Sequence, residues 1–306
     1  MKACRKAFTE TLLEIAKRDK NIWALATDSR GSVTLTEFAD QLPEQFVECG
    51  IAEQDAVGVA AGLTLEGRTA FVCGPASFYA TRSAEQVKVD VAYSHRDVKV
   101  VGVSGGVSYG ALGGTHHAVQ DIAFMRAVPG LQVFIPADAA QAAAMTRAIA
   151  YSGEPAYVRM GRGDVEDVYT GECPFEIGKA NTLKEGTDAA IIACGEMLHP
   201  SLKAAEILAE KGVNVSVIDM HTIKPLDEAA IIAAAKTGLV VTVEEHSVKG
   251  GLGSAVAEVV CQKCPVKMRI LGLPDETLYS GTNREVFAHY GLIAEGIADS
   301  VLEALK

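Results

Sequence analysis

Short apolar runs rich in β-branched residues alternate with alanine-rich stretches of helical period along the first half of the chain. Apolar runs without strict polar alternation predict strands that are covered on both faces, as in a parallel sheet flanked by helices. The predicted strands are residues 22–27, 69–73, 98–104, 132–135 and 156–160. The helical patterns cover residues 2–18, 51–65, 79–92, 119–128 and 138–151. This alternation makes right-handed crossover connections the expected topology.

The same alternation starts again near residue 187. The predicted strands of this second block are residues 189–193, 213–219, 239–243 and 266–271. Its helical patterns cover residues 197–211, 227–236, 251–262 and 293–305. Between the blocks, residues 161–186 are rich in Gly, Asp, Glu and Pro and lack a clear period. We therefore predict an α/β fold with two domains, 1–165 and 187–306, each a mostly parallel sheet flanked by helices, joined by a linker at 166–186.

Composition narrows the class of protein. A chain of 306 residues is long enough for two domains that each bury a core. The formal net charge of −11 argues against nucleic acid as a partner, because phosphate binding needs a concentrated positive surface. No apolar run is long enough to predict a membrane span, and no apolar signal core follows the N-terminus. Seven scattered cysteines are typical of a reducing compartment, so we expect a cytoplasmic protein.

The first candidate for chemistry is the segment 50–62, which reads as a helix of small residues with Glu53 and Asp55 in its first turn. Acids at that end of a helix complement its macrodipole, which stabilises the helix by roughly 0.3–1 kcal/mol. Taken alone, the pattern favours this ordinary interpretation. The alternative is that Glu53 points at a ligand that the small residues allow to approach closely.

The second candidate is a glycine-rich segment after the strand predicted at 98–104. Residues 102–114 contain six glycines, and Thr115, His116 and His117 follow. Ligands of α/β sheets usually bind in loops at the carboxyl ends of strands, and histidine titrates near neutral pH. A long loop in a compact domain is usually functional, so we favour a binding site over a mobile loop. A zinc site is a weak alternative, because no cysteine lies nearby in sequence.

The third candidate is Arg162, which follows the strand predicted at 156–160. The planar guanidinium fork suits phosphate or carboxylate groups, although a surface pair with Asp164 or Glu166 explains the pattern equally well. Two weaker motifs are interpreted structurally. The Cys-x-x-Cys pair at 261–264 lacks a second pair and precedes a proline, so we expect a helix end there. Residues 249–254 lack the Gly-Lys-Ser/Thr ending of a phosphate loop and predict a turn into a helix.

Several motifs in one order resemble the C-terminal half of transketolases and of 1-deoxy-xylulose-5-phosphate synthases. They are Gly50-Ile51-Ala52-Glu53-Gln54, Thr115-His116, Ile135-Pro136-Ala137-Asp138, Lys224-Pro225-Leu226-Asp227, Val243-Glu244-Glu245-His246 and Gly250-Gly251-Leu252-Gly253-Ser254. The similarity covers nearly the whole chain and is greatest to a transketolase C-terminal subunit encoded separately from its N-terminal half. It implies a pyrimidine-binding domain followed by a transketolase C-terminal domain.

The resemblance implies thiamine diphosphate chemistry that moves a two-carbon ketol unit between sugars or sugar phosphates. The family glutamate at the Glu53 position hydrogen-bonds the aminopyrimidine ring and promotes the tautomer that deprotonates the thiazolium ring. An aromatic side chain covers the pyrimidine, and Phe78 and Tyr79 are both candidates for it. Arg82 is expected to border the cofactor. The protein supplies orientation and proton transfer, and the cofactor supplies the electron sink.

On the substrate side, His116 matches a family histidine that contacts sugar hydroxyls and stabilises the oxyanion of the intermediate. Arg162 matches an arginine that holds the sugar phosphate, and Arg5 a second one. Two positions depart from the family pattern. Leu112 stands where transketolases carry an aspartate, and Ser104 replaces a histidine that helps bind phosphate in many of them. These departures point to a modified or differently phosphorylated sugar, or another acceptor aldehyde, in place of the usual substrates.

The family motif Gly-Asp-Gly, which with a later asparagine binds the diphosphate and Mg²⁺, is absent from this sequence. Because that motif belongs to the N-terminal half, the resemblance implies a partner subunit that carries it and binds Mg²⁺, a hard cation that prefers oxygen ligands. We expect no metal ligands in this chain. The resemblance also implies a homodimer of this chain at the centre of a two-plus-two heterotetramer. The second domain is expected to serve dimer packing and not chemistry.

Three alternatives remain open at this point. The beta chain of a 2-oxoacid dehydrogenase complex shares the two-domain layout and also needs a partner chain. A condensation like that of 1-deoxy-xylulose-5-phosphate synthase is a second alternative. A non-catalytic homologue that binds sugar phosphate is the third, and the departures at Leu112 and Ser104 motivate it. The presence of Glu53 argues against a non-catalytic role, because a buried acid is costly to keep without a task.

Overall fold

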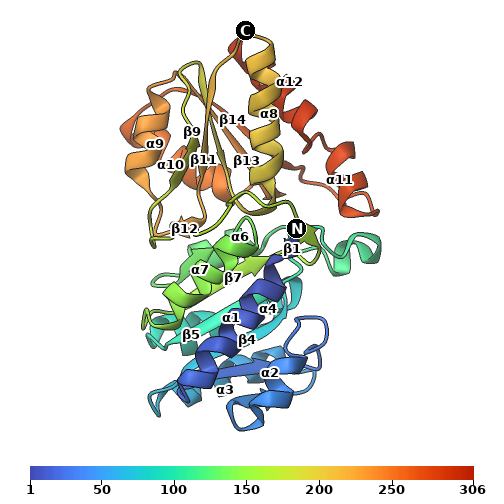
Figure 1. Cartoon of the computed structure of the whole chain (residues 1–306), viewed down its shortest axis with the longest axis vertical. Helices are drawn as coiled ribbons and strands as arrows, with labels where there is room; N and C mark the ends of the chain where they lie inside the picture. The colour runs from blue at the N-terminus through green and yellow to red at the C-terminus, as the bar shows by residue number, and fades with distance from the viewer.

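Two sheets organise the chain, and the computed structural model describes all residues, 1–306 (Figure 1). The first sheet has seven strands in the order β12-β6-β7-β5-β4-β2-β3. Its strands are β2 (Ile22–Ala26), β3 (Phe46–Glu48), β4 (Thr69–Pro75), β5 (Val98–Val103), β6 (Gln132–Phe134), β7 (Ala156–Met160) and β12 (Thr222–Lys224). All neighbours pair in parallel except β12, which is antiparallel to β6. The five strands predicted for this block are all present.

Helices cover both faces of the first sheet, as the continuous apolar runs predict. On one face α1 (Cys4–Arg18) and α7 (Ala139–Ala150) lie side by side and bury Phe71 and Val101 of the sheet. On the other face lie α3 (Glu53–Thr64), α4 (Ala76–Arg82) and α6 (Asp121–Ala127), with residues such as Val72 beneath them. A short helix, α2 (Thr36–Gln41), lies in the connection after β2.

The helix predicted at 79–92 is not continuous, and the prediction is wrong on this point. It consists of α4, the short α5 (Ala84–Gln86) and a π-helical segment, η2 (Val87–Tyr93). Ser83 separates α4 from α5 with non-helical dihedral angles, and its hydroxyl donates to the carbonyl oxygen of Tyr79 at 2.7 Å. A serine that bonds back to the preceding turn in this way bends a helix. The break leaves Arg82 as the last residue of α4.

The second sheet has the order β14-β13-β10-β11-β9. Its strands are β9 (Asn181–Lys184), β10 (Ala189–Ala193), β11 (Val215–Asp219), β13 (Leu239–Ser247) and β14 (Lys267–Leu273). Its helices are α8 (Leu198–Glu210) and α12 (Ala294–Leu305) on one face, with α11 (Asn283–His289) on the same side, and α9 (Glu228–Ala235) and α10 (Leu252–Lys263) on the other face (Figure 1). The edge strand β9 lies within the segment predicted as a linker and pairs antiparallel with β11.

Two features connect the two blocks, and two further contacts each lie within one block. The strand β12 comes from the second half of the sequence but joins the first sheet, and one hydrophobic cluster runs through both blocks. The N-terminal strand β1 (Lys2–Ala3) pairs with β8 (Asp164–Val165) just after β7. The helix α10 begins at Leu252, where the Glu244 carboxylate accepts its first main-chain N–H groups, and it ends before Cys264. The interpretations of the two weaker motifs are therefore confirmed.

Candidate active site

The carboxyl ends of the central strands carry the candidate residues. Because β4, β5 and β7 are parallel neighbours, the segments that follow them emerge at the same edge of the sheet. The helix α4 follows β4, the glycine-rich loop follows β5, and Arg162 follows β7. The β1–β8 pair adds the N-terminus to this edge, since Ala3 lies opposite Asp164. Segments that are distant in sequence thus converge at one place.

Glu53 is the first residue of α3 and is only 5% exposed. Its Oε1 atom lies 3.1 Å from Nη1 of Arg82, so the buried carboxylate has the cationic partner that it needs. The Arg82 guanidinium in turn lies over the ring of Phe78, with its central carbon 4.0 Å from the ring centroid. The structure therefore brings together three of the residues that the resemblance assigns to the cofactor.

The two aromatic candidates have different environments. Phe78 is half-buried and lies beside Arg82, whereas Tyr79 is fully buried in the core with its hydroxyl 3.4 Å from Oγ1 of Thr27. Burial raises the pKa of Tyr79 far above its ordinary value. A side chain enclosed in this way cannot cover a ligand ring. The assignment of Tyr79 is corrected accordingly, and Phe78 is the aromatic candidate.

His116 continues the same row of side chains. Its ring packs edge-on against Phe78, with centroids 5.4 Å apart, and against Tyr109, with centroids 5.2 Å apart. Its Nδ1 atom lies 2.9 Å from Oγ1 of Thr115. The hydrogen bond to Thr115 holds the imidazole by one nitrogen, so Nε2 is the nitrogen left to face a ligand. Sequence reasoning gave Tyr109 no role, and its place in the glycine-rich loop is the only signal for it.

Two arginines end the row. The Arg162 guanidinium lies 5.0 Å from the ring centroid of Tyr109, and no ion pair joins it to Asp164 or Glu166. The sequence alternative of a surface pair is therefore wrong. Arg5 donates to the carbonyl oxygen of Ser32, and its buried Nε atom has no partner. Burial lowers the pKa of Arg5, and the like charge of Arg162 lowers it further. The Asp164 carboxylate offsets this repulsion only in part, so the two neighbouring cations favour an anionic ligand.

The two positions that depart from the family pattern lie in the same loop. Ser104 is buried at the end of β5 with a left-handed backbone, at φ +62°. Leu112 is 56% exposed and lies between Tyr109 and His116 in the loop, in a 3-10 helix (Gly110–Thr115). An exposed leucine beside the candidate histidine adds apolar surface where a carboxylate would have added charge. The loop therefore differs in polarity from the pattern that the resemblance implies.

The comparisons with known proteins decide the family. The family model "Transketolase, pyrimidine binding domain" matches residues 1–167, and "Transketolase, C-terminal domain" matches residues 178–297. The chain belongs to the transketolase family. It is 55% identical to an apulose-4-phosphate transketolase subunit of Phocaeicola vulgatus, over all of this chain and 98% of the relative. It is 38% identical to the 6-deoxy-6-sulfo-D-fructose transketolase subunit SqwH of a Clostridium species, over 99% of this chain and 94% of the relative.

A solved structure gives the same answer for the fold. The protein titled "Split gene transketolase, inactive beta4 tetramer" superposes with a TM-score of 0.93 at 37% identity, covering 100% of this chain and 99% of that chain. These matches confirm the resemblance to a transketolase C-terminal subunit, the α/β fold and the assignment as a transferase subunit of the split type. Membership of this transketolase family implies dependence on thiamine diphosphate. None of the helices of this transketolase subunit has the length and apolarity needed to cross a membrane.

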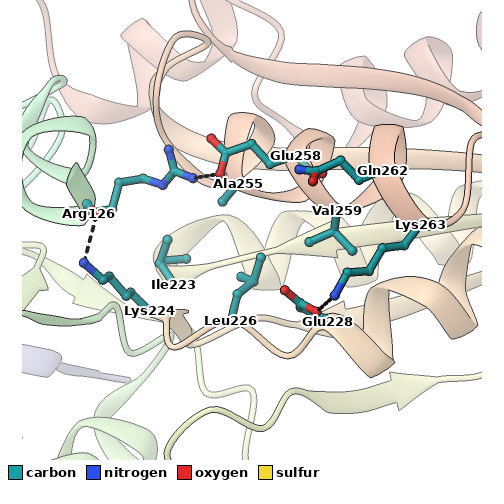
Figure 2. A pocket seen from close by; sticks show the side chains of 10 residues that line it. All are labelled: Arg126, Ile223, Lys224, Leu226, Glu228, Ala255, Glu258, Val259, Gln262 and Lys263. Carbon is teal, nitrogen blue, oxygen red and sulfur yellow. Dashed lines mark hydrogen bonds and ion pairs between the residues drawn. The ribbon is translucent and has the colours of Figure 1, made fainter. Parts of the chain in front are cut away.

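A separate cavity of about 470 Å³ in this transketolase subunit lies between α6, β12 and α10 (Figure 2). Arg126 pairs with Glu258 at 2.7 Å on one side, and Lys263 pairs with Glu228 on the other. The ammonium group of Lys224 donates to main-chain carbonyl oxygens, including that of Arg126 at 3.1 Å. Each cation of the cavity thus has an ion-pair or hydrogen-bond partner within the chain. None of the candidate site residues lines this cavity. We therefore take the edge of the first sheet as the candidate active site.

Proposed function

We propose that this chain completes a thiamine diphosphate site with a partner subunit and there transfers a two-carbon ketol unit between sugar phosphates. One observation carries the proposal: a row of side chains in mutual contact joins the cofactor candidates to the phosphate candidates. The row consists of Glu53, Arg82, Phe78, His116, Tyr109 and Arg162. All of them belong to the domain proposed at residues 1–165, and residues 187–306 form the second domain.

The residues present fit the pyrimidine part of the cofactor. A buried carboxylate, a half-buried aromatic ring and two buried polar atoms without partners, Ser77 Oγ and Gln86 Oε1, lie along or beside α4. When bound, thiamine diphosphate supplies a carbon nucleophile and an electron sink for the ketol unit. In this arrangement Glu53 holds a proton at a ring nitrogen, and Phe78 covers the ring. Arg82 restrains the Glu53 carboxylate before the cofactor binds.

The other end of the row suits a sugar phosphate. Arg162 and Arg5 would bind the phosphate as a pair of cations, because they lie close enough for the charge of Arg162 to lower the pKa of Arg5. His116 would reach the sugar hydroxyls through Nε2 and donate to the oxygen that becomes negative in the reaction. Tyr109 keeps the imidazole and the Arg162 guanidinium apart at a fixed spacing, since its ring packs against both.

The proposal assigns the diphosphate and Mg²⁺ to the partner subunit, the chain that carries Gly-Asp-Gly. The absence of that motif from this sequence supports the assignment. We also propose self-association to a homodimer within a two-plus-two heterotetramer. Exposed apolar side chains on or next to α3 and η2 support it, namely Ile51, Val59, Leu65, Val89 and Tyr93. Seven free cysteines support a reducing, cytoplasmic location.

For the substrate we propose apulose 4-phosphate as the donor, by analogy with the relative at 55% identity whose name includes that sugar. The exposed Leu112 supports a sugar other than the usual ones, because it replaces a carboxylate with an apolar contact. The pair of Arg5 and Arg162 supports a sugar that carries an anionic group, which can be a phosphate or a sulfonate.

The proposal is tested by ketol transfer in the complex of this chain with a Gly-Asp-Gly partner, thiamine diphosphate and Mg²⁺. Donors are apulose 4-phosphate, xylulose 5-phosphate and 6-deoxy-6-sulfo-fructose, with a 2-oxoacid as the test of the dehydrogenase alternative. We expect apulose 4-phosphate to have the highest kcat/KM. Glu53→Ala should lower turnover by roughly 10²–10⁴-fold without unfolding the chain, as expected for loss of a proton-transferring group. Turnover of the 2-oxoacid alone, or no turnover of any sugar, would contradict the proposal.

A further inference from the structure

The second domain reaches the base of the glycine-rich loop. The strand β13 continues to Ser247, four residues beyond the predicted end at residue 243, and brings Glu245 beneath the loop. The main-chain N–H of Val107 donates to Oε1 of Glu245 at 2.8 Å. The Glu245 side chain is only 4% exposed. A buried carboxylate of one domain thus holds a main-chain group of the loop that bears Tyr109 and His116.

Arg159 on β7 completes this contact. Its Nη2 atom donates to the main-chain oxygen of Glu245 at 2.6 Å and lies 3.5 Å from Oε2 of the same residue. Its Nε atom lies 3.2 Å from Oδ2 of Asp121, the first residue of α6. Since Arg162 follows three residues later, the same cluster anchors the strand that presents the phosphate candidate. Both loops of the site therefore start from one buried cluster of ionisable side chains, Asp121, Arg159 and Glu245.

The local sequence is adapted to this close approach. A Cβ atom at Gly105 would lie 2.4 Å from Nε of Arg159, and one at Gly106 would lie 2.1 Å from Cδ of Glu245. Gly106 also has a positive φ, at +60°. Only glycine leaves room for the guanidinium and the carboxylate against the main chain here. Further along the loop, a Cβ atom at Gly110 would lie 2.2 Å from the carbonyl oxygen of Gly281, in the second domain.

Main-chain hydrogen bonds connect the anchored base to the reactive end. The N–H of Gly110 donates to the carbonyl oxygen of Val107 at 2.7 Å, and the carbonyl oxygen of Gly110 lies 3.0 Å from Nε2 of His117. Gly106 and Ala118 form a bridge that closes the loop. A shift of Val107 would therefore move the whole turn that carries Tyr109 and His116.

We propose that Glu245 is a positioning residue for the transfer reaction, through which the second domain sets the placement of Tyr109 and His116. This inference rests on the proposed function, because it assigns to the second domain a part in catalysis beyond dimer packing. A displacement of about 1 Å in a catalytic group can cost roughly 10²-fold in rate, so a contact of this kind matters without touching substrate.

The charge state of Glu245 supplies an independent signature. Burial raises the pKa of Glu245 to about 8, and the charge of Arg159 opposes that rise only in part. The other groups that face it are Asp121 on α6, Glu196 in the 3-10 turn after β10, and Cys194 before that turn. Glu245 therefore gains its charge near pH 8, and below that pH one of its oxygens still accepts from Val107. Glutamine has the same shape and acceptor, so it should replace Glu245 well under these conditions.

The test uses Glu245→Leu and Glu245→Gln in the complex with the partner subunit and cofactor. We expect Glu245→Leu to lower kcat about tenfold or more with a smaller change in KM. Glu245→Gln should restore kcat to within about threefold of wild type, since the acceptor for Val107 is kept. The matched control is Glu244→Leu, because Glu244 is equally buried but accepts from Leu252 and Gly253, away from the loop. The control should lose thermal stability and keep kcat.

Two readouts separate positioning from a general loss of structure. Amide exchange of the segment 105–117 should quicken about tenfold or more in Glu245→Leu and stay unchanged in the control. The kcat of wild type should decline between about pH 7 and 9, as Glu245 gains a charge that faces Asp121 and Glu196, and the decline should be absent in Glu245→Gln. If Glu245→Leu fails to fold, this pH comparison with Glu245→Gln decides the matter.

Different results would contradict the proposed function and the positioning role of Glu245. If the wild-type complex transfers no ketol unit, the proposed function is wrong. If wild type is active, and Glu245→Leu keeps kcat within twofold or Glu245→Gln shows the same decline with pH as wild type, the proposed function survives. In that case Glu245 has no positioning role, and the inference is overturned.

Discussion

Charged side chains in the candidate site divide into those with a partner and those without one. The Glu53 carboxylate has Arg82 at 3.1 Å, whereas Arg5 and Arg162 form no ion pair and repel each other, a repulsion that the Asp164 carboxylate offsets only in part at Arg5. Two neighbouring cations that form no ion pair within the chain favour a phosphate ligand. For Phe78 and Tyr79, the sequence does not predict which of the two side chains is buried. Their order in the motif is known, but which ring faces outward depends on where α4 starts.

We predict that Arg162→Gln raises KM for a phosphorylated donor roughly 10- to 150-fold and changes kcat little. The reason is the loss of a charged hydrogen bond worth about 1.5–3 kcal/mol to the bound phosphate. The measurement is steady-state kinetics of the reconstituted complex with phosphorylated and unphosphorylated donors. Arg68→Gln is the matched control, because Arg68 also lies over an aromatic ring, 4.6 Å from the centroid of Trp23. Equal KM effects on both donors would contradict the assignment of Arg162.

Secondary-structure elements were predictable where burial dominates the sequence pattern. The central strands β2, β4, β5 and β7 carry long apolar runs, and all were predicted within two residues at each end. The edge strands β3, β9 and β12 were missed because each has only three or four residues, and an edge strand needs no continuous apolar run. The break at Ser83 was missed because one hydroxyl bond to the main chain leaves no periodic signal.

We also predict that the face formed by the helices α3 and η2 mediates self-association. Tyr93 is 86% exposed on this face, so an interface would bury a large aromatic side chain there. Tyr93→Asp should weaken the dimer at least about tenfold, as sedimentation of the isolated chain over a concentration series would show. Tyr151→Asp, 64% exposed outside this face, is the control and should leave the dimer unchanged. A dimer that is equally stable in both variants would contradict the prediction.

For the whole molecule, we propose that the first domain supplies one wall of a site and that the second domain supports it. The need for a partner could be predicted from sequence, because the absence of Gly-Asp-Gly is visible without a structure. The contact of Glu245 with Val107 could not, since it joins residues 138 positions apart whose sequence context shows only a buried strand and a glycine-rich loop. Such a tertiary contact leaves no local signal.

The proposed contact of Glu53 is with a cofactor whose metal and diphosphate are held by another subunit. Its most direct test is calorimetric titration of thiamine diphosphate with Mg²⁺ into this chain alone, into the partner alone and into their mixture. We predict that thiamine diphosphate binds strongly to the mixture only. Its binding should be at least about tenfold weaker when the mixture contains Glu53→Ala, because a buried hydrogen bond is lost. Tight binding to this chain alone, or equal affinity with and without the Glu53 carboxylate, would contradict the account.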